Sequence, residues 1–427
     1  MLARYPSRRT SPGPTFSAIC PLTFCFSRST PKLDRYLAAR STLTTPSVAS
    51  KQPIPDSTDR SELDSGSNDV RDAEYMRRAL ALAQQGWGQT APNPMVGAVV
   101  VRDGVVVGEG FHARYGEAHA EVVALKAAGD RAQGSTMYVT LEPCNHFGKT
   151  PPCTETIIQA RVSRVVIAAA DPTALAGGGA RHLADYGVRV DFGVEEAAAL
   201  ELNAPFFFAA TNPNRPWVTL KLALSSDGKM NDPSGEHRWI SNEQSRAEVQ
   251  RLRANVDAIA VGLGTVRADD PQLTARGPIR PRIAPLRVVF DRDAETPLES
   301  NLVRTARQTP TAIFAHHPAI TRLAALHNAG VDVFEAEDLP DALEALHGFE
   351  LQHLLVEGGA RVAQEFLKRK LVDRLIIFHS PITLGTNALS PFDGFQSDFR
   401  EWLASLPIIR RAELGEDVMS VFAMREA

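Results

Sequence analysis

One histidine, two cysteines and one glutamate are spaced along the chain in a pattern that suits a catalytic metal ion. His119-Ala-Glu121 opens a helix-like stretch, Pro143-Cys144 follows some 23 residues later, and Cys153 comes nine residues after Cys144. An imidazole and two thiolates are ligands that a catalytic zinc ion keeps while water takes the fourth position. Zinc lowers the pKa of that water towards neutrality, and Glu121 is the natural proton shuttle to a leaving amine. The pattern predicts a hydrolytic zinc enzyme.

Taken singly, these residues also have ordinary explanations. A His-x-Glu pair is common in sequences, and two buried cysteines belong more often to a core than to a metal site. Their combination in the order strand, His-Ala-Glu helix, strand, Pro-Cys is much more specific. Because Cys144 follows a predicted strand and a proline, we expect it to cap a helix whose dipole favours a thiolate.

Alternating strands and helices are predicted to position these residues. Asp103-Gly104 is typical of the turn of a β-hairpin. From Asp69 onward the apolar pattern predicts helices at 73–85, 120–128 and 154–160, and strands at 96–101, 105–108, 137–141 and 165–169. A hairpin followed by βαβ units indicates an α/β layer sandwich.

A second α/β unit is predicted after the turn-rich segment 211–216. The apolar run Pro205–Ala210 just before it is expected to be buried strand or core. Gly358-Gly359 lies between a strand and a helix N-terminus, where backbone amides can approach a phosphate. It is not the Gly-x-Gly-x-x-Gly fingerprint, so a Rossmann domain is not indicated. Strands are predicted at 217–223, 258–261, 287–290, 311–315, 331–334, 353–356 and 374–379.

Composition excludes several classes of protein. The 427 residues include 46 basic and 50 acidic side chains, for a net charge of −4, and 44% are hydrophobic. This balance excludes collagen-like and mostly disordered chains and argues against a nucleic-acid binder, which usually carries a basic surplus. No apolar run approaches the roughly 18 residues of a membrane span. Four cysteines are too few for a disulfide scaffold, and a reducing compartment is expected.

Residues 1–68 differ from the rest and are expected to form a disordered leader. Residues 1–55 carry eight basic side chains and one acidic one, and the stretch is rich in Ser, Thr and Pro. This composition is typical of an organelle transit peptide, and an upstream-extended start or unstructured tail of a bacterial protein is the alternative. The predicted location is therefore the cytoplasm, or a plastid if the leader is a transit peptide.

The first half closely resembles the deaminase domain of the bifunctional riboflavin-biosynthesis deaminase/reductase family. Eight residues separate the two cysteines, whereas nucleobase deaminases generally have two. The resemblance implies a cytidine-deaminase-like, three-layer α/β/α fold, with Asn93 and His112 holding the pyrimidine and His146 and Lys149 the phosphoribosyl end. The matching segments are Thr90–Gly97, Gly110–His112, His119–Glu121 and Pro143–Cys153.

The second half contains the segments Lys221–Lys229, Gly235–Ser241, Val261–Arg276 and Leu354–Ala363, in that order. Together they resemble the reductase domain of the same family, which is similar to dihydrofolate reductase in fold. The sequence departs from the family at His237 and Arg292, where serine is common; an arginine at 292 suits the 2′-phosphate of NADPH. The resemblance implies substrate contacts at His237, Arg253, Leu273, Arg276 and Glu357. It implies cofactor contacts at Ala223, Trp239, Thr265, Asp269, Arg292, Gly359, Ala360, Arg361, Val362, Ala363, Gln364 and Glu365.

Together the two resemblances imply a bifunctional enzyme with a zinc deaminase domain at 69–212 and an NADPH-dependent reductase domain at 213–427. They imply deamination of 2,5-diamino-6-(5-phosphoribosylamino)pyrimidin-4(3H)-one, then reduction to 5-amino-6-(5-phosphoribitylamino)uracil. One Zn²⁺ per chain, NADPH, a small-molecule substrate and a homo-oligomer are expected, with no nucleic-acid or membrane partner. Two alternatives stay open: a deaminase of cytidine or of a nucleic-acid base, and a non-catalytic binding protein that kept the fold.

Overall fold

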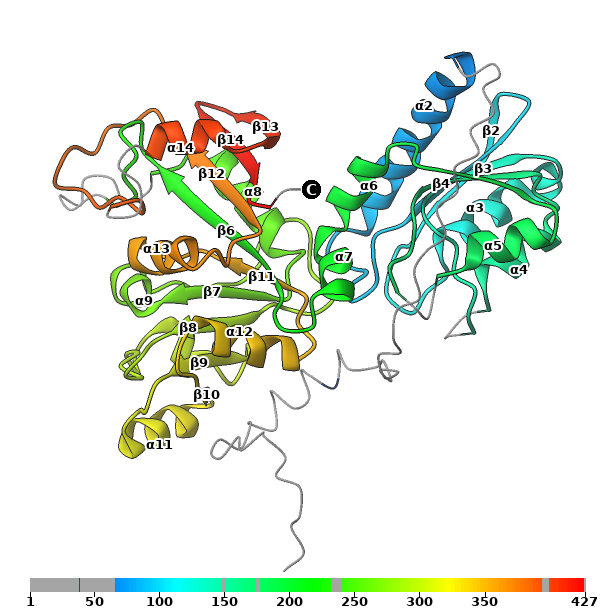
Figure 1. The fold of residues 1–427 in the computed structure, drawn as a ribbon. Helices are drawn as coiled ribbons and strands as arrows, with labels where there is room; N and C mark the ends of the chain where they lie inside the picture. Colours follow the sequence, from blue (N-terminus) through cyan, green and yellow to red (C-terminus); the bar gives the residue numbers. More distant parts are fainter. Residues whose placement is uncertain are drawn as a thin grey trace, which may run out of the picture.

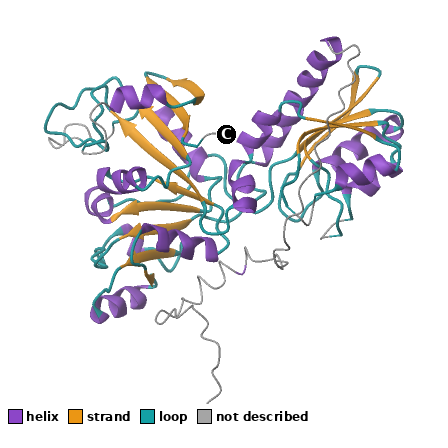
Figure 2. Ribbon diagram, viewed as in Figure 1, coloured by secondary structure: helices purple, strands orange, loops and turns teal. Residues whose placement is uncertain are grey.

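The chain forms two α/β bodies that lie side by side, each built around its own sheet (Figures 1 and 2). The computed structural model describes residue 38 and residues 66–147, 151–173, 177–231, 240–393 and 399–425. Most of the predicted leader, residues 1–68, lies outside the described residues. No described helix has the length and apolar character needed to cross a membrane.

The first body holds a five-stranded sheet in the order β2-β1-β3-β4-β5. β1 pairs antiparallel with β2 and β3, while β3, β4 and β5 are parallel. Its strands are β1 (Gly97–Arg102), β2 (Val105–Phe111), β3 (Thr136–Leu141), β4 (Arg164–Ala169) and β5 (Arg189–Phe192). Its helices are α2 (Gly66–Ala83), η1 (Gln84–Gly86), α3 (Ala120–Ala128), η2 (Gly129–Ala132), α4 (Cys153–Gln159), α5 (Gly179–Asp185), α6 (Glu196–Leu202) and α7 (Ala204–Thr211).

Side chains that alternate along β1 bind two helical layers to this sheet. Ala98 and Val100 pack in a core with α3, α4 and α5, whereas Val99 and Val101 pack against α2 and α6. Successive residues of a strand point to opposite faces, so both faces of the sheet are covered. The three-layer arrangement implied by the sequence is confirmed.

The second body holds a nine-stranded sheet in the order β10-β9-β8-β7-β11-β6-β12-β14-β13. The strands from β10 through β9, β8, β7, β11 and β6 to β12 are all parallel. β14 pairs antiparallel with β12, and β13 pairs antiparallel with β14. Its strands are β6 (Trp217–Leu224), β7 (Ala258–Gly262), β8 (Leu286–Phe290), β9 (Thr311–Ala315), β10 (Asp332–Glu335), β11 (His353–Val356), β12 (Arg374–His379), β13 (Ile408–Leu414) and β14 (Asp417–Ala423). Its helices are α8 (Glu243–Arg253), α9 (Leu263–Asp269), α10 (Asn301–Arg304), α11 (Ile320–Ala329), α12 (Leu339–Gly348), α13 (Ala360–Lys368) and α14 (Phe399–Ser405).

The same alternation covers both faces of the second sheet. On β7, Ala258 and Ala260 pack in the core with α12 and α13, whereas Ile259 and Val261 pack with α9, α10 and α11. α8 covers the outer part of the sheet through Val249, which packs on β12 and β14. This body therefore also has three layers, and its parallel strands end at one common edge.

The structure differs from the sequence-based expectation at several elements. The run Pro205–Ala210, expected as strand or core, lies within helix α7, where Phe208 is buried and its neighbours are partly exposed. α5, β5, α6 and the terminal hairpin of β13 and β14 were not predicted. β13 is mostly exposed, and its apolar and charged residues do not alternate, so it carries no strong periodic signal.

The turn after α2 and η1 in the first body contacts the end of α8 in the second body. The indole nitrogen of Trp87 donates to the carbonyl of Arg251, 2.8 Å away, and the Arg251 guanidinium lies 4.2 Å from the centre of the Trp87 ring. The amide of Gly88 donates to the side-chain oxygen of Asn255 at 2.8 Å. Gly88 has φ +73°, and a Cβ there would lie 2.4 Å from the carbonyl oxygen of Ala254. Only glycine permits this close approach.

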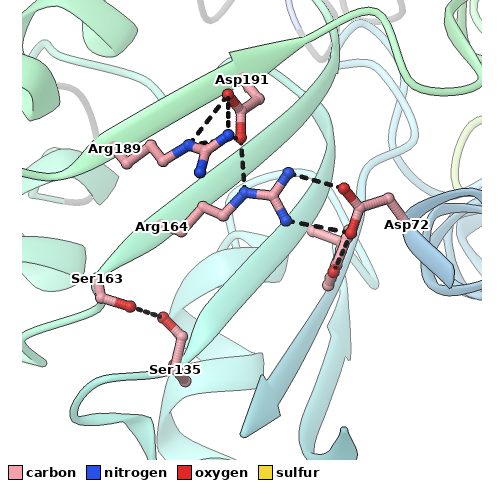
Figure 3. A network of polar contacts seen from close by, with 7 residues as sticks. Asp72, Ser135, Ser163, Arg164, Arg189 and Asp191 are labelled. Carbon is pink, nitrogen blue, oxygen red and sulfur yellow. Dashed lines mark hydrogen bonds and ion pairs between the residues drawn. The ribbon is translucent and has the colours of Figure 1, made fainter. Parts of the chain in front are cut away.

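A buried ionic network ties α2 to the first sheet (Figure 3). Asp72 on α2 accepts two hydrogen bonds from Arg164, at 3.1 and 2.7 Å, and one from the Tyr138 hydroxyl at 2.6 Å. Arg164 also donates to Asp191 on β5 at 2.6 Å. Burial works against the charge of Asp72, but the hydrogen bonds from Arg164 and Tyr138 bring its pKa below the ordinary value.

Replacing Asp72 with asparagine is expected to destabilise the first body by about 2–3 kcal/mol, because Arg164 and Tyr138 lose a buried anionic acceptor. Arg164 keeps Asp191, which limits the loss. Hydrogen exchange of the β3 and β4 amides, followed by mass spectrometry, should be faster in the variant. Asp103→Asn, in an exposed hairpin turn, is the control; an equal acceleration there would contradict the assignment.

The largely buried imidazole of His353 predicts a pH dependence of stability in the second body. His353 contacts the Thr219 hydroxyl at 2.9 Å across β11 and β6, and burial lowers its pKa from 6.5 to about 4. The unfolded chain therefore binds a proton between pH 6.5 and 4 that the folded chain does not. Stability is retained above pH 6.5 and falls by up to about 3 kcal/mol as the pH approaches 4. In urea unfolding, His353→Asn should flatten this decline; equal slopes would contradict it.

Candidate active sites

The first candidate site lies where the N-termini of α3 and α4 meet the end of β3. His119 is the residue before α3, Glu121 is in its first turn, and Cys153 is the first residue of α4. Cys144 follows β3 by three residues. Three segments that are distant in the sequence thus bring the predicted residues together.

The geometry of the three predicted ligands fits a tetrahedral metal ion. The Nδ1 atom of His119 lies 3.3 Å from the Cys153 sulfur and 3.5 Å from the Cys144 sulfur, and all three ligand atoms lie within 4.8 Å of one another. A zinc ion bound at ordinary lengths would separate its nitrogen and sulfur ligands by about 3.5 Å. The donor set and spacing therefore fit Zn²⁺, with one coordination position free for water.

The electrostatics of this site favour a shared proton and a thiolate. Hydrogen bonds from Cys153 and His119 lower the pKa of Cys144, whereas the bond to Cys144 and burial raise the pKa of Cys153. Glu121 is 3% exposed, and burial raises its pKa in spite of the nearby charge of His119. A carboxyl group with a raised pKa can both accept and donate a proton near neutral pH.

Two predicted pyrimidine-binding residues lie beside the ligand cluster. The side-chain amide of Asn93 is 3.4 Å from the Nε2 atom of His112, and the rings of His112 and His119 meet edge to face with centres 5.3 Å apart. The other ring nitrogen of His112 contacts the carbonyl of Ala118 at 3.2 Å. Burial lowers the pKa of His112, so this imidazole is neutral at pH 7.

The expectation that Cys144 caps a helix is wrong. Residues 142–145 are non-helical, and the nearest helix, α4, begins nine residues later at Cys153. The amide of Cys153 nevertheless donates to the Cys144 sulfur at 3.4 Å, so a helix N-terminus still faces the thiolate. Of the two predicted phosphoribosyl contacts, His146 has a buried Nδ1 atom without a hydrogen-bond partner, and Lys149 lies outside the described residues.

The second candidate site centres on a buried ion pair at the edge where the parallel strands end. The guanidinium of Arg253, the last residue of α8, donates two hydrogen bonds to the Glu357 carboxylate at 2.6 and 2.8 Å. Both side chains are about one-tenth exposed (12% and 10%). Burial opposes the charge of Glu357, but Arg253 and Lys221 together lower its pKa. The pKa of Lys221 on β6 is itself lowered by burial.

Several predicted cofactor residues meet at the same edge. α9 begins after β7 and α13 begins after β11, and these strands are neighbours. A Cβ at Gly359 would lie 3.0 Å from the Thr265 hydroxyl, and one at Gly262 would lie 2.5 Å from a methyl group of Val362. The glycines therefore let two helix N-termini converge, which leaves backbone amides available to an anionic cofactor.

The remaining predicted reductase residues differ in how well they can reach a ligand. Leu273, with φ +48°, is 2% exposed, and Arg276 is exposed beside Gln272, to which it donates a hydrogen bond. Ala363 packs in the core, and its amide bonds to the carbonyl of Gly359. Ala223 is partly exposed; Arg361, Glu365, Asp269 and Arg292 are exposed; Ala360 and Gln364 are partly exposed. His237 and Trp239 lie outside the described residues.

Two residues beside these sites were not identified from the sequence. Lys221 is a charged residue within the otherwise largely apolar strand β6. A charged residue in such a strand indicates that the strand meets solvent or a functional site there. Glu142 directly precedes Pro143-Cys144 at the end of a buried strand and is 8% exposed. A charged residue in such a run was the available signal in both cases.

The fold and the two sites define a two-domain enzyme, in which a metal-dependent deaminase unit is joined to a reductase unit. Residues 69–169 match the family model of the cytidine and deoxycytidylate deaminase zinc-binding region, and residues 216–417 match the RibD C-terminal domain. The chain belongs to the RibD family, the bifunctional deaminase/reductases of riboflavin biosynthesis. The predicted family, fold class and enzyme class are therefore confirmed.

Relatives align with nearly the whole of both units. The riboflavin biosynthesis protein RibD of Aquifex aeolicus (strain VF5) is 42% identical over 317 residues, which cover 74% of this chain and 88% of the relative. Acinetobacter baumannii RibD superposes with a TM-score of 0.71 at 36% identity, covering 83% of this chain and 99% of that one. A diaminohydroxyphosphoribosylaminopyrimidine deaminase/5-amino-6-(5-phosphoribosylamino)uracil reductase from Thermotoga maritima has the same TM-score and coverage at 32% identity.

Proposed function

We propose that this chain carries out two successive reactions on one phosphoribosyl pyrimidine. The first hydrolyses 2,5-diamino-6-(5-phosphoribosylamino)pyrimidin-4(3H)-one, consuming water and releasing ammonia. The second reduces the ribosyl group to ribityl with NADPH and a proton, giving 5-amino-6-(5-phosphoribitylamino)uracil and NADP⁺. The observation that carries the proposal is the convergence of His119, Cys144 and Cys153 beside the buried Glu121, on the same chain as the Arg253–Glu357 pair.

In the proposed deaminase site, His119, Cys144 and Cys153 hold Zn²⁺, which when bound supplies the Lewis acidity that makes water nucleophilic near neutral pH. As the water oxygen bonds to the ring carbon that carries the amine, Glu121 accepts the water proton. It then returns this proton to the departing amine, so the carbon–nitrogen bond breaks to give ammonia. Asn93 offers an amide to the pyrimidine edge, and its contact with neutral His112 orients it. His146 and Lys149 are proposed to bind the phosphoribosyl end.

In the proposed reductase site, NADPH supplies the hydride for C1′ when it is bound. Glu357 faces the substrate, and Arg253 orients the Glu357 carboxylate. Arg253 has this role because most of its N–H donors already bond to Glu357 and to the carbonyl of Thr274. Arg276 is exposed and is proposed to bind the 5-phosphate. Leu273 is proposed to shape the pocket, and His237 to contact the substrate.

We place NADPH along the edge formed by the ends of β6, β7, β8 and β11. In parallel sheets ligands bind outside the carboxyl ends of the strands, where the strand order reverses. Here the reversal lies at β11, which is inserted between β6 and β7. The first turn of α13, Gly359–Val362, and Thr265 are proposed to contact the phosphates, because Ala363 is turned into the core. The other proposed contacts are Ala223, Trp239, Asp269, Arg292, Gln364 and Glu365.

The finer organisation is also proposed. Deaminase residues 69–212 and reductase residues 213–427 would form separate domains, preceded by a leader at 1–68, in a cytoplasmic homo-oligomer. N-terminal sequencing of the native protein would show whether the leader is removed on entry to a plastid, and light scattering would give the oligomeric state.

The test uses the purified, zinc-loaded chain and the diaminopyrimidine phosphate. Ammonia is followed with and without NADPH, and NADPH oxidation is followed in parallel. Ammonia release without NADPH, then oxidation when NADPH is added, would support both reactions and their order. Ammonia release without NADPH oxidation would support the deaminase reaction alone. If a zinc-loaded chain released no ammonia, the proposed substrate would be wrong. In that case, release of ammonia from cytidine would favour the alternative class of deaminase.

A further inference from the structure

The segment 142–144, which carries the proposed ligand Cys144, is hydrogen-bonded to several neighbouring elements. The amide of Glu142 donates to the carbonyl of Ala169 at 3.0 Å, which extends the pairing of β3 with β4. The carbonyl of Cys144 accepts from the amide of Thr154 at 3.4 Å, and the Cys144 sulfur accepts from the amide of Cys153 at 3.4 Å. The backbone on either side of Pro143 is therefore anchored to β4 and to α4.

The Glu142 carboxylate anchors the same segment to a third element, α5. One oxygen accepts from the amides of Gly178 and Ala180, at 3.1 and 2.9 Å, and the other accepts from the amide of Asp171 at 3.2 Å. Glu142 is 8% exposed, and these three hydrogen bonds all come from backbone amides. Amides at a helix N-terminus stabilise a negative charge, so a carboxylate suits this place better than a neutral side chain.

Pro143 links this anchor rigidly to Cys144. Its ring restricts φ, and its carbonyl oxygen presses against Gly179, where a Cβ would lie only 1.9 Å away. α5 and the segment 142–144 are thus in direct backbone contact. A displacement of Glu142 would therefore move Cys144 as well, because Pro143 between them is restricted in φ and lies against Gly179.

We propose that Glu142 is a positioning residue of the deaminase site, which sets the direction of the Cys144 thiolate by anchoring the segment 142–144 to the N-terminus of α5. Glu142 does not touch the reacting atoms; it acts through Cys144. The inference rests on the proposed zinc site of His119, Cys144 and Cys153. Groups that orient metal ligands contribute about 10–100-fold to metal affinity or activity.

The test is the substitution Glu142→Gln in the full chain. Glutamine has nearly the same shape and keeps one oxygen for Gly178 and Ala180, but it turns an N–H group towards the amide of Asp171. We expect zinc to be lost to a competing chelator at least tenfold more readily than from the wild type. With Co²⁺ in place of zinc, the thiolate and d–d absorption bands should change, and kcat for ammonia release should fall more than KM rises.

Two further variants separate positioning from general stability. Asp72→Asn removes another buried carboxylate of the same body, which pairs with Arg164 at the start of β4, and should leave zinc competition within twofold of the wild type. Gly179→Ala keeps Glu142 but pushes a methyl group against the Pro143 carbonyl, and it should weaken zinc binding in the same direction. It decides the question if Glu142→Gln fails to fold, as judged by circular dichroism and by reductase activity.

The outcomes are distinguishable. Unchanged zinc competition and an unchanged Co²⁺ spectrum in Glu142→Gln would overturn the positioning role while the proposed zinc site stands. An equal loss of zinc in Asp72→Asn would overturn it too, because the effect would then be one of stability. A wild-type chain that binds no zinc would overturn the proposed zinc site and, with it, this inference.

Discussion

The substitution Glu121→Gln is expected to lower the rate of ammonia release by about three orders of magnitude, within the 10²–10⁴-fold range of general acid–base catalysis. Glutamine fits the same buried place in the first turn of α3 but can neither take up nor return a proton. The zinc content should stay unchanged, because the three proposed ligands are untouched. Steady-state release of ammonia, measured on samples with a known zinc content, checks the prediction.

The same chain provides an internal control for this variant. NADPH oxidation should proceed at the wild-type rate when the deaminated pyrimidine is supplied directly, because the second site lies on a separate sheet. Glu117→Gln is the matched control, since Glu117 is exposed a few residues before His119. If Glu121→Gln retained more than a tenth of the deaminase rate with zinc bound, Glu121 would not be the proton shuttle.

Local patterns in the sequence were enough to select His119, Cys144 and Cys153, which the structure brings together. His119 and Glu121 come from one helix start and Cys153 from another, and the predicted boundaries of α3 match the structure. The spacing of the ligands along the chain is itself informative, because βαβ units bring strand ends and helix starts to one edge. The spacing could not predict the surrounding backbone. The expectation that Cys144 caps a helix was wrong, because contacts with α5, far along the sequence, hold Glu142 and Pro143 in a non-helical segment.

The reductase site was harder to predict, because its residues are brought together by tertiary pairing. Arg253 ends a helix that packs on β12 and β14, while Glu357 follows β11, a strand inserted between β6 and β7. No local periodicity reports such an insertion. Elements with little burial were also missed: β13 does not alternate between apolar and polar residues, and β5 alternates over only four residues, which is too short for a periodic signal.

The second large effect is expected for Glu357→Gln. The substitution leaves Arg253 and Lys221 in a buried place without their anion, and removing one partner of a buried, hydrogen-bonded pair typically costs several kcal/mol. Glutamine offers one acceptor where Arg253 donates to two carboxylate oxygens at 2.6 and 2.8 Å. Lys221, whose pKa burial already lowers, loses the neighbouring negative charge that raises its pKa.

NADPH oxidation with the deaminated substrate should therefore fall about 100-fold or more in Glu357→Gln, while ammonia release stays within twofold of the wild type. Glu248→Gln is the matched control: it breaks the pair between Glu248 and Arg251 on the same helix, a contact of the kind worth only about 0.3–0.5 kcal/mol. A reductase rate within threefold of the wild type would show that the carboxylate is not needed.

A double variant tests whether Arg253 acts through Glu357 or independently of it. If Arg253 acts mainly by orienting Glu357, then Arg253→Met together with Glu357→Gln should lose little more activity than Glu357→Gln alone. The interaction energy from the double-mutant cycle would then be large. If the two losses instead add in full, Arg253 contacts the substrate independently, as the family resemblance implies.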